Sequence, residues 1–214
     1  MRLKNVKFYI FKLIKDGQFW QNIDLNGKEK KPKFFFSSIQ LTFIAISIVW
    51  GIYSNNGVNN DFIGYSIAAL SIFIGLFLTL LLSVFDKFKG IDFSKANKND
   101  DVKIDLIRMK NFFKQFTALT SYSILLSILS ILLLILFYLI PGLDINLLDY
   151  TFVDSINKIS VDNGVLFIRN TIILIHRIAV AYFLLDFLLI VIYAVTSFYS
   201  YIYNEYEQIK IDKS

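Results

Sequence analysis

Four long apolar stretches dominate the pattern of hydrophobic and polar positions along this chain: 34–53, 63–85, 116–140 and 171–203. Each is long enough for a helix to cross the hydrocarbon core of a bilayer, which takes about 20 residues. Short connections are expected to pair the first two and the last two as antiparallel hairpins. The pattern therefore predicts an all-α polytopic membrane protein with four transmembrane helices.

The fourth stretch is unusual because His176, Arg177 and Asp186 interrupt it. As one helix it would be roughly 50 Å long, so its ends must lie outside a hydrocarbon core of about 30 Å. If Arg177 marks the outer edge of the hydrocarbon, Asp186 lies near the middle. An ionised carboxylate there costs at least about 2.5 kcal/mol. We therefore expect Asp186 to face a cavity, a partner or an ion.

Asp186 needs a partner other than Arg177, because the two residues lie about 13 Å apart along one helix and near opposite faces. The candidates are the hydroxyls of the third stretch, Gln40, a neighbouring subunit, or a proton on Asp186 itself. The competing interpretation is an uncharged, hydrogen-bonded Asp186 with a structural role only. His176, Arg177 and Arg169 are expected at the outer interface, with their charged heads reaching the lipid headgroups.

Small and hydroxylated side chains form two stripes at helical spacing. The second stretch carries Ser71, Gly75, Thr79 and Ser83. The third stretch carries Thr120, Ser123, Ser127 and Ser130. Small residues every four positions let helix backbones approach closely. One stripe could line an aqueous path while the other packs, or both could be packing seams.

Residues 1–33 form a basic segment ahead of the first stretch. Apolar side chains gather on one helical face of residues 3–14, opposite lysines that include Lys4, Lys12 and Lys15. We expect a basic amphipathic helix in the cytoplasmic interface, where these lysines contact lipid or form a gate. A plain flanking segment rich in positive charge is the alternative. Gly17 is expected to form a turn.

The helix of the third stretch is expected to begin well before its apolar part. Within the linker 86–115, Gly90 marks a basic, flexible connection, and Asn99 is a suitable cap before an acidic first turn. No helix breaker intervenes before Pro141. One helix of about 40 residues is therefore predicted, roughly 60 Å long. Its cytoplasmic stalk would bind a partner or a subunit, or lie against the membrane or the first segment.

The basic residues are distributed unevenly between alternate loops. Residues 1–33 carry nine Lys or Arg and residues 86–115 carry eight, whereas the loop 54–62 carries none and the acidic loop 141–170 carries two. The positive-inside rule places the basic segments in the cytoplasm. Both termini, including a short frayed tail at 204–214, are therefore expected on the cytoplasmic side.

Composition excludes several classes of function. Hydrophobic residues make up 56% of the 214 and charged residues 18%, below the roughly 25% usual in soluble domains. The absence of cysteine and the single histidine exclude disulfides, thiolate metal sites and histidine-based metal clusters. No phosphate-binding glycine loop, catalytic triad or metalloprotease motif is found. Neither an enzyme nor a cofactor-binding protein is expected.

Residues 1–33, 99–140 and 171–203 together give a basic start, a helical stalk and a charged last span. This arrangement resembles the small four-span membrane effectors of bacterial anti-phage defence, the Hailong membrane effector first and the Kiwa membrane subunit second. The resemblance implies a homo-oligomer in the bacterial inner membrane, with a tetramer favoured, that is restrained until infection. In Hailong-like systems a nucleotidyltransferase and its nucleic-acid product take part in the restraint. A cytoplasmic regulatory protein or a nucleotide or nucleic-acid signal is thus an implied partner.

The function expected from these observations is a homo-oligomeric ion channel or pore that a ligand or partner opens. Asp186 and the hydroxyl stripe of the third stretch would face the assembly axis and replace part of an ion's hydration. The basic segment and the stalk would form the cytoplasmic gate. Two alternatives stay open: a non-conducting scaffold or sensor that anchors a cytoplasmic partner, and a small proton-coupled carrier subunit with Asp186 as its relay.

Overall fold

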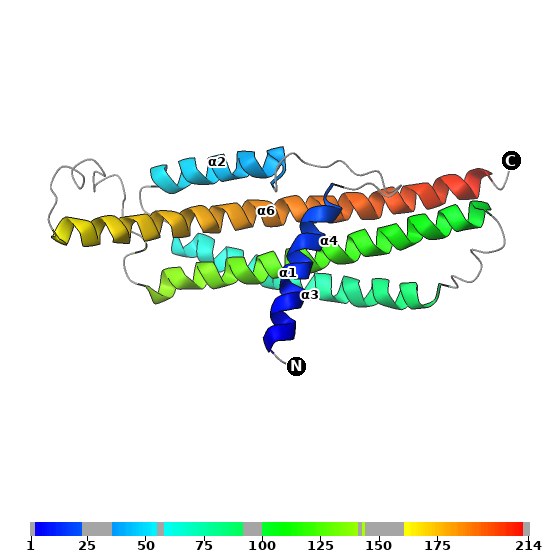
Figure 1. Ribbon diagram of the computed structural model, residues 1–214, viewed down its shortest axis with the longest axis horizontal. Coiled ribbons are helices and arrows are strands. Elements are labelled where there is room, and N and C mark those ends of the chain that lie inside the picture. The colour runs from blue at the N-terminus through cyan, green and yellow to red at the C-terminus, as the bar shows by residue number, and fades with distance from the viewer. Residues whose placement is uncertain are drawn as a thin grey trace. The chain divides into compact units, whose positions relative to one another are not determined.

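The computed structural model describes residues 3–22, 36–54, 58–91, 100–140, 143 and 161–211. All regular secondary structure in these residues is helical, as predicted. The helices are α1 (Leu3–Trp20), α2 (Ser38–Tyr53), α3 (Asn60–Lys89), α4 (Asp100–Leu139) and α6 (Val161–Ile211) (Figure 1).

Three of these helices are long and apolar enough to cross a membrane: α3, Lys103–Leu139 of α4, and Phe167–Asn204 of α6. They mark the chain as a membrane-associated protein. α2 is equally apolar, but its 16 residues extend only about 24 Å, less than the roughly 30 Å of a hydrocarbon core. The predicted first span is therefore shorter than its apolar stretch indicated.

α2 begins at Ser38 rather than at residue 34 because Ser37 caps it. The Ser37 hydroxyl accepts a hydrogen bond from the backbone N–H of Gln40, and Gln40 Oε1 accepts one from the backbone N–H of Ser37. This reciprocal pair is a capping box, which satisfies two backbone donors at the start of a helix. The Ser-x-x-Gln spacing is present in the sequence and identifies this start.

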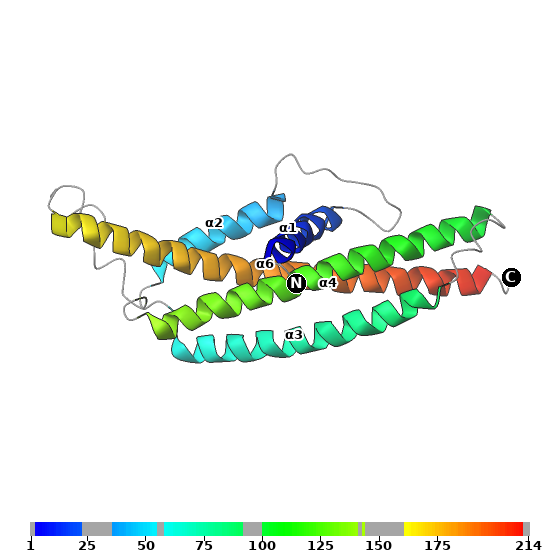
Figure 2. The same ribbon diagram turned by 60° about the horizontal axis from the view of Figure 1, so that its bottom comes forward.

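The longer helices extend beyond the apolar stretches that predicted them. α3 runs over residues 60–89 instead of 63–85, and α4 is one helix of 40 residues, as predicted. Asn99, the expected cap of α4, lies outside the described residues. α6 has 51 residues and takes in the end of the predicted outer loop and most of the tail, where fraying was expected (Figure 2). No proline interrupts residues 161–211, so the helix has no break there.

The chain divides into two compact units. Unit 1 consists of Met1–Lys33, Ile74–Leu125 and Leu188–Ser214, and unit 2 of Phe34–Phe73 and Leu126–Phe187. α3, α4 and α6 each contribute one segment to each unit, whereas α1 belongs to unit 1 and α2 to unit 2.

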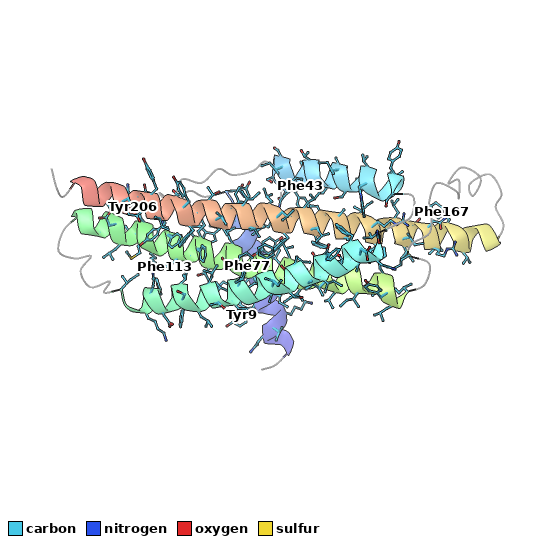
Figure 3. The ribbon with its side chains drawn as sticks, turned by 180° about the vertical axis from the view of Figure 1, so that it is seen from behind. Tyr9, Phe43, Phe77, Phe113, Phe167 and Tyr206 are labelled. Carbon is cyan, nitrogen blue, oxygen red and sulfur yellow. The ribbon has the colours of Figure 1, made fainter. Side chains whose placement is uncertain are left out.

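Aromatic side chains form the core of unit 1. Phe112, Phe113 and Phe116 of α4 pack with Val84 of α3, and Tyr201 of α6 stacks on Phe112 with ring centroids 4.1 Å apart. Figure 3 shows Phe77 and Phe113 projecting from α3 and α4 in this unit. Such rings bury large apolar areas, so this cluster ties three helices together.

α1 packs on α4 through its second half. Gln18 Nε2 donates to the hydroxyl of Tyr122 at 3.1 Å, and Gln115 Nε2 donates to the backbone carbonyl of Trp20 at 3.0 Å. Gln115 also accepts from the Ser197 hydroxyl of α6 at 2.8 Å, so it joins three helices. The turn predicted at Gly17 is wrong: Gly17 is helical and buried, and it lets α1 approach Tyr122 closely.

The small-residue seam predicted on α3 does not pack within the protomer. Its members are all exposed, namely Ser71, Gly75, Thr79 and Ser83. α3 instead buries a larger side chain at every seventh position, namely Ile63, Leu70, Phe77 and Val84. Burying large apolar side chains removes more area from water or lipid contact and gains more dispersion contacts. α3 therefore buries the face that carries these large side chains and leaves the face with the small residues exposed.

The contact at Gly17 leads to a stability prediction. A Cβ at this position would lie 2.5 Å from Tyr122 Cγ, at the root of the ring, where the side chain cannot swing aside. We expect Gly17→Ala to lower the free energy of unfolding by roughly 1–3 kcal/mol, as overpacking does. Thermal unfolding in detergent micelles measures the change.

Gly75→Ala is the matched control, because a Cβ there meets nothing within 4 Å. The helix propensity of alanine should make this variant neutral or slightly stabilising. The cost of Gly17→Ala should be smaller when it is measured in a Tyr122→Ala background, where the ring that clashes is absent. Equal melting temperatures for the two alanine variants would contradict close packing of α1 on α4.

Candidate functional site

Asp186 is fully buried in unit 2 and contacts α2. Gln40 Nε2 donates a hydrogen bond of 2.9 Å to Asp186 Oδ1, and both side chains are 0% exposed. Among the partners considered from the sequence, the structure thus provides Gln40. Because Gln40 is the third residue of α2, the carboxylate lies beside the first turn of that helix.

The capping box orients the amide of Gln40. Its Oε1 accepts from the backbone N–H of Ser37, so its Nε2 is the atom available to donate to Asp186. The amino-terminal end of a helix also carries a partial positive charge, which stabilises an anion near it. One side chain therefore completes the start of α2 and holds the carboxylate of Asp186.

Arg177 lies at the other end of α2. Its two terminal nitrogens donate to the backbone carbonyls of Ser54, at 3.0 Å, and of Leu143, at 3.1 Å. Ser54 is the residue that ends α2, where a helix carries a partial negative charge that a cation stabilises. The expectation that Arg177 reaches lipid headgroups is wrong, because its side chain is 0% exposed.

His176 is also held inside unit 2 rather than at a lipid-facing surface. Its Nε2 lies 2.9 Å from the backbone carbonyl of Leu133 in α4, and its ring meets Phe137 edge-on at 4.6 Å. A carbonyl oxygen only accepts, so Nε2 must carry the proton in this contact. Arg169, the third residue predicted at the outer interface, is exposed.

The two charges of α6 therefore bracket α2. Asp186 lies at its amino-terminal turn and Arg177 at its carboxyl-terminal cap, each next to the helix end of opposite partial charge. We call the Gln40–Asp186 and Arg177–Ser54 contacts the α2 clamp. It explains why Asp186 and Arg177 do not pair with each other. The nine-residue offset between the two charges is visible in the sequence, but their contacts with the two ends of α2 are seen only in the structure.

Few other side chains of α2 are buried among the described residues. Its buried residues are Gln40, Ser47 and Gly51, and a Cβ on Gly51 would lie 3.1 Å from Ile178 Cγ1 of α6. The large apolar side chains of α2 are mostly exposed, as at Ile46 (50%) and Val49 (56%). The small buried residues Ser47 and Gly51, together with the α2 clamp, thus fix α2 against α6.

The hydroxyl stripe predicted to line a pore is buried. Thr120 and Ser123 belong to unit 1, whereas Ser127 and Ser130 belong to unit 2 with Asp186. All five side chains are 0% exposed, and Ser123 donates to the backbone carbonyl of Thr120. They do not lie on a free face of the protomer, where residues lining an axis between protomers are expected.

The predicted lysines occupy different surroundings. The side chain of Lys4 lies outside the described residues, and Lys15 is exposed. Lys12 lines a groove between α1, α3 and α4 in unit 1. Within the described ranges, no group of three or more His, Asp or Glu side chains lies close enough to hold a metal ion.

The clamp makes Gln40 more important than an ordinary capping residue. Gln40→Leu removes the donor to Asp186 and leaves a buried carboxylate with one hydrogen bond fewer, which costs roughly 1–3 kcal/mol in addition to the lost cap. Ser37→Ala removes the cap alone and should cost about 1 kcal/mol. Gln40→Leu should therefore lower the free energy of unfolding in detergent by more than Ser37→Ala does. Equal losses would show that the bond to Asp186 contributes nothing.

Arg177 should be sensitive to neutral replacement. Arg177→Gln removes charged hydrogen bonds to two backbone carbonyls, and each such bond contributes roughly 1.5–3 kcal/mol. The expected result is a clear fall in melting temperature in detergent, with Arg169→Gln, an exposed arginine of the same helix, as the control. A variant at Arg177 that melts like the control would refute the clamp at this end.

Comparison of the chain with models of protein families, with curated proteins and with solved structures finds no match. The resemblance to the Hailong and Kiwa membrane proteins therefore gains no support from a family or a structural neighbour. Function has to be inferred from the contacts that the chain itself makes, above all those of Asp186.

Proposed function

We propose that this protein is a four-span integral membrane protein that assembles into a homo-oligomeric, gated ion channel. Asp186 is the charged group of its ion pathway. The observation that carries this proposal is a fully buried carboxylate in the middle of an apolar helix, hydrogen-bonded to a neutral amide. Ionisable residues inside membrane helices are costly and typically mark ion or proton pathways.

Further buried polar groups of unit 2 support a pathway. Ser47 of α2 and Ser127 and Ser130 of α4 are 0% exposed. Ser47 and Ser130 have hydroxyls without a hydrogen-bond partner in the described part of the chain. Buried hydroxyls normally find a partner, and those without one can exchange hydrogen bonds with water or an ion. The path supported by these positions runs through the protomer rather than along the axis of an assembly.

The short α2 counts as a span in this proposal. Membranes and helices adapt to a mismatch of a few ångströms by local thinning or by anchoring at the ends. The positive-inside rule then puts both termini and the 86–115 linker in the cytoplasm. Asp186, beside the start of α2, comes to lie near the cytoplasmic end of the hydrocarbon core instead of its middle, where ionisation costs less.

The exposed surfaces of α2 and α3 support oligomerisation. Both helices expose apolar side chains, and α3 adds the small-residue stripe that leaves its backbone accessible. Small residues at four-residue spacing support close helix packing between protomers. We propose a bacterial inner-membrane effector of anti-phage defence as the biological setting, with α1 and the start of α4 as the gate that a cytoplasmic partner or nucleotide signal acts on.

The α2 clamp favours one other candidate function, a non-conducting membrane scaffold or sensor. In that case Asp186 and Arg177 serve only to fix α2, and the polar interior has no transport role. Asp186→Asn separates the two functions, because the asparagine oxygen can still accept from Gln40 while the charge is lost.

The test is cation flux into liposomes containing purified protein, with wild type beside Asp186→Asn. We expect the flux to fall at least about tenfold in the variant, since the loss of about 1.4 kcal/mol of ion stabilisation already gives that factor. Asp61→Asn is the matched control, because Asp61 is an exposed acid in the first turn of α3 and belongs to neither the proposed pathway nor the proposed gate. It should conduct like wild type.

Unchanged flux in a folded Asp186→Asn variant would remove Asp186 from the pathway. Absence of flux both in the wild type and in a variant that lacks residues 1–20 would favour the scaffold. Depolarisation of bacterial cells on expression provides an independent measurement of pore formation.

A further inference from the structure

A groove of about 750 Å³ lies between α1, α3 and α4 in unit 1. Its walls are apolar and include Leu82 and Phe85 of α3, which are 67% and 52% exposed, and Trp20 of α1. The volume falls within the range of small-molecule sites, which is about 300–1,000 Å³. The channel proposal gives this groove no role.

Charged side chains stand beside this apolar wall. Lys12 and Asp16 come from α1 and Lys114 from α4. Among the described residues, neither lysine forms a salt bridge. The groove therefore combines a long apolar wall with two ammonium groups and one carboxylate, an excess of one positive charge.

We propose that this groove binds one anionic phospholipid. The phosphate lies between the ammonium groups of Lys12 and Lys114, and an acyl chain follows the wall formed by Leu82 and Phe85. Basic pockets between membrane helices on the cytoplasmic side are suited to anionic headgroups. A lysine can direct its ammonium group to the headgroup while its methylene stem stays on apolar surface.

The other possible occupant, a second copy of the chain, is less favoured by charge. The chain carries a net charge of +5, so a second copy adds positive charge to a groove that is already positive. An apolar helix face would also leave both lysines without a counter-charge. The lipid satisfies the wall and the lysines together.

This inference deepens the proposed function by naming the lipid class that contacts α1, and it rests on the membrane location alone. Bound lipid would join α1 to α3 and α4. Since α1 is the proposed gate, the anionic lipid content of the membrane would influence opening.

The chain contains two tryptophans, Trp20 in the groove and Trp50 in α2. In a Trp50→Phe background, the fluorescence of Trp20 reports contact with lipids that carry bromine on their acyl chains. The full-length protein is reconstituted in phosphatidylcholine bilayers that contain an equal mole fraction of brominated phosphatidylglycerol or brominated phosphatidylcholine. The expected result is an about fivefold preference for phosphatidylglycerol, as one net basic charge near a lipid surface gives.

The variant Lys12→Gln with Lys114→Gln should lose this preference, with a ratio of one or below, because only the carboxylate of Asp16 then remains in the groove. Lys15→Gln with Lys110→Gln is the matched control, because these exposed lysines of the same two helices do not line the groove. It should keep the preference of the wild type.

Three results would overturn the lipid site. These are equal quenching by both brominated lipids, a preference that survives in the Lys12/Lys114 variant, and no quenching by either lipid because protein covers the groove. Protein that floats with the liposomes but gives one of these results leaves the channel proposal standing. Protein that fails to float contradicts both.

Discussion

The hydrogen bond from the amide of Gln40 to the carboxylate of Asp186 is the contact on which unit 2 depends most. A carboxylate removed from water must be compensated by donors, and here one donor is supplied by the capping residue of a neighbouring helix. The same amide completes the start of α2. At the carboxyl-terminal end of α2 the positive charge of Arg177 is held in a corresponding way, by donating to the backbone carbonyl of Ser54. α2 is therefore located by charge and polarity, since it buries few large side chains.

Unit 1 is held together in a different way. Stacked and tilted aromatic rings supply the buried area, and Gln115 connects α1, α4 and α6 through two hydrogen bonds. Aromatic packing tolerates small shifts, whereas a glutamine with both ends of its amide bonded fixes a register. The contact of Gly17 with Tyr122 shows how close α1 comes. The first half of α1 has no comparable cover, and its residues 5–12 are exposed.

The clamp changes how the charges of α6 relate to function. A buried acid in an apolar helix is a reason to look for transport, but two charges that match the ends of a neighbouring helix also have a structural explanation. Both roles can belong to the same residue, because a carboxylate has two oxygens and about four acceptor positions, more than the one that Gln40 uses. The hydroxyls of Ser47 and Ser130 extend the polar interior of unit 2 beyond the clamp itself.

The sequence alone determined the helices, because long apolar stretches without proline satisfy their backbone hydrogen bonds only within a helix. It determined the continuous α4 for the same reason, and it placed Gln40 among the partners of Asp186. Tertiary structure decided the rest. Gln40 and Asp186 are 146 positions apart, so local spacing could not select that pair. Gly17 is a turn signal in sequence, yet Tyr122 across the helix interface requires a glycine there. On α3 the small stripe and the large side chains have compatible helical periods, and only the packing of neighbouring helices determines which of the two faces is buried.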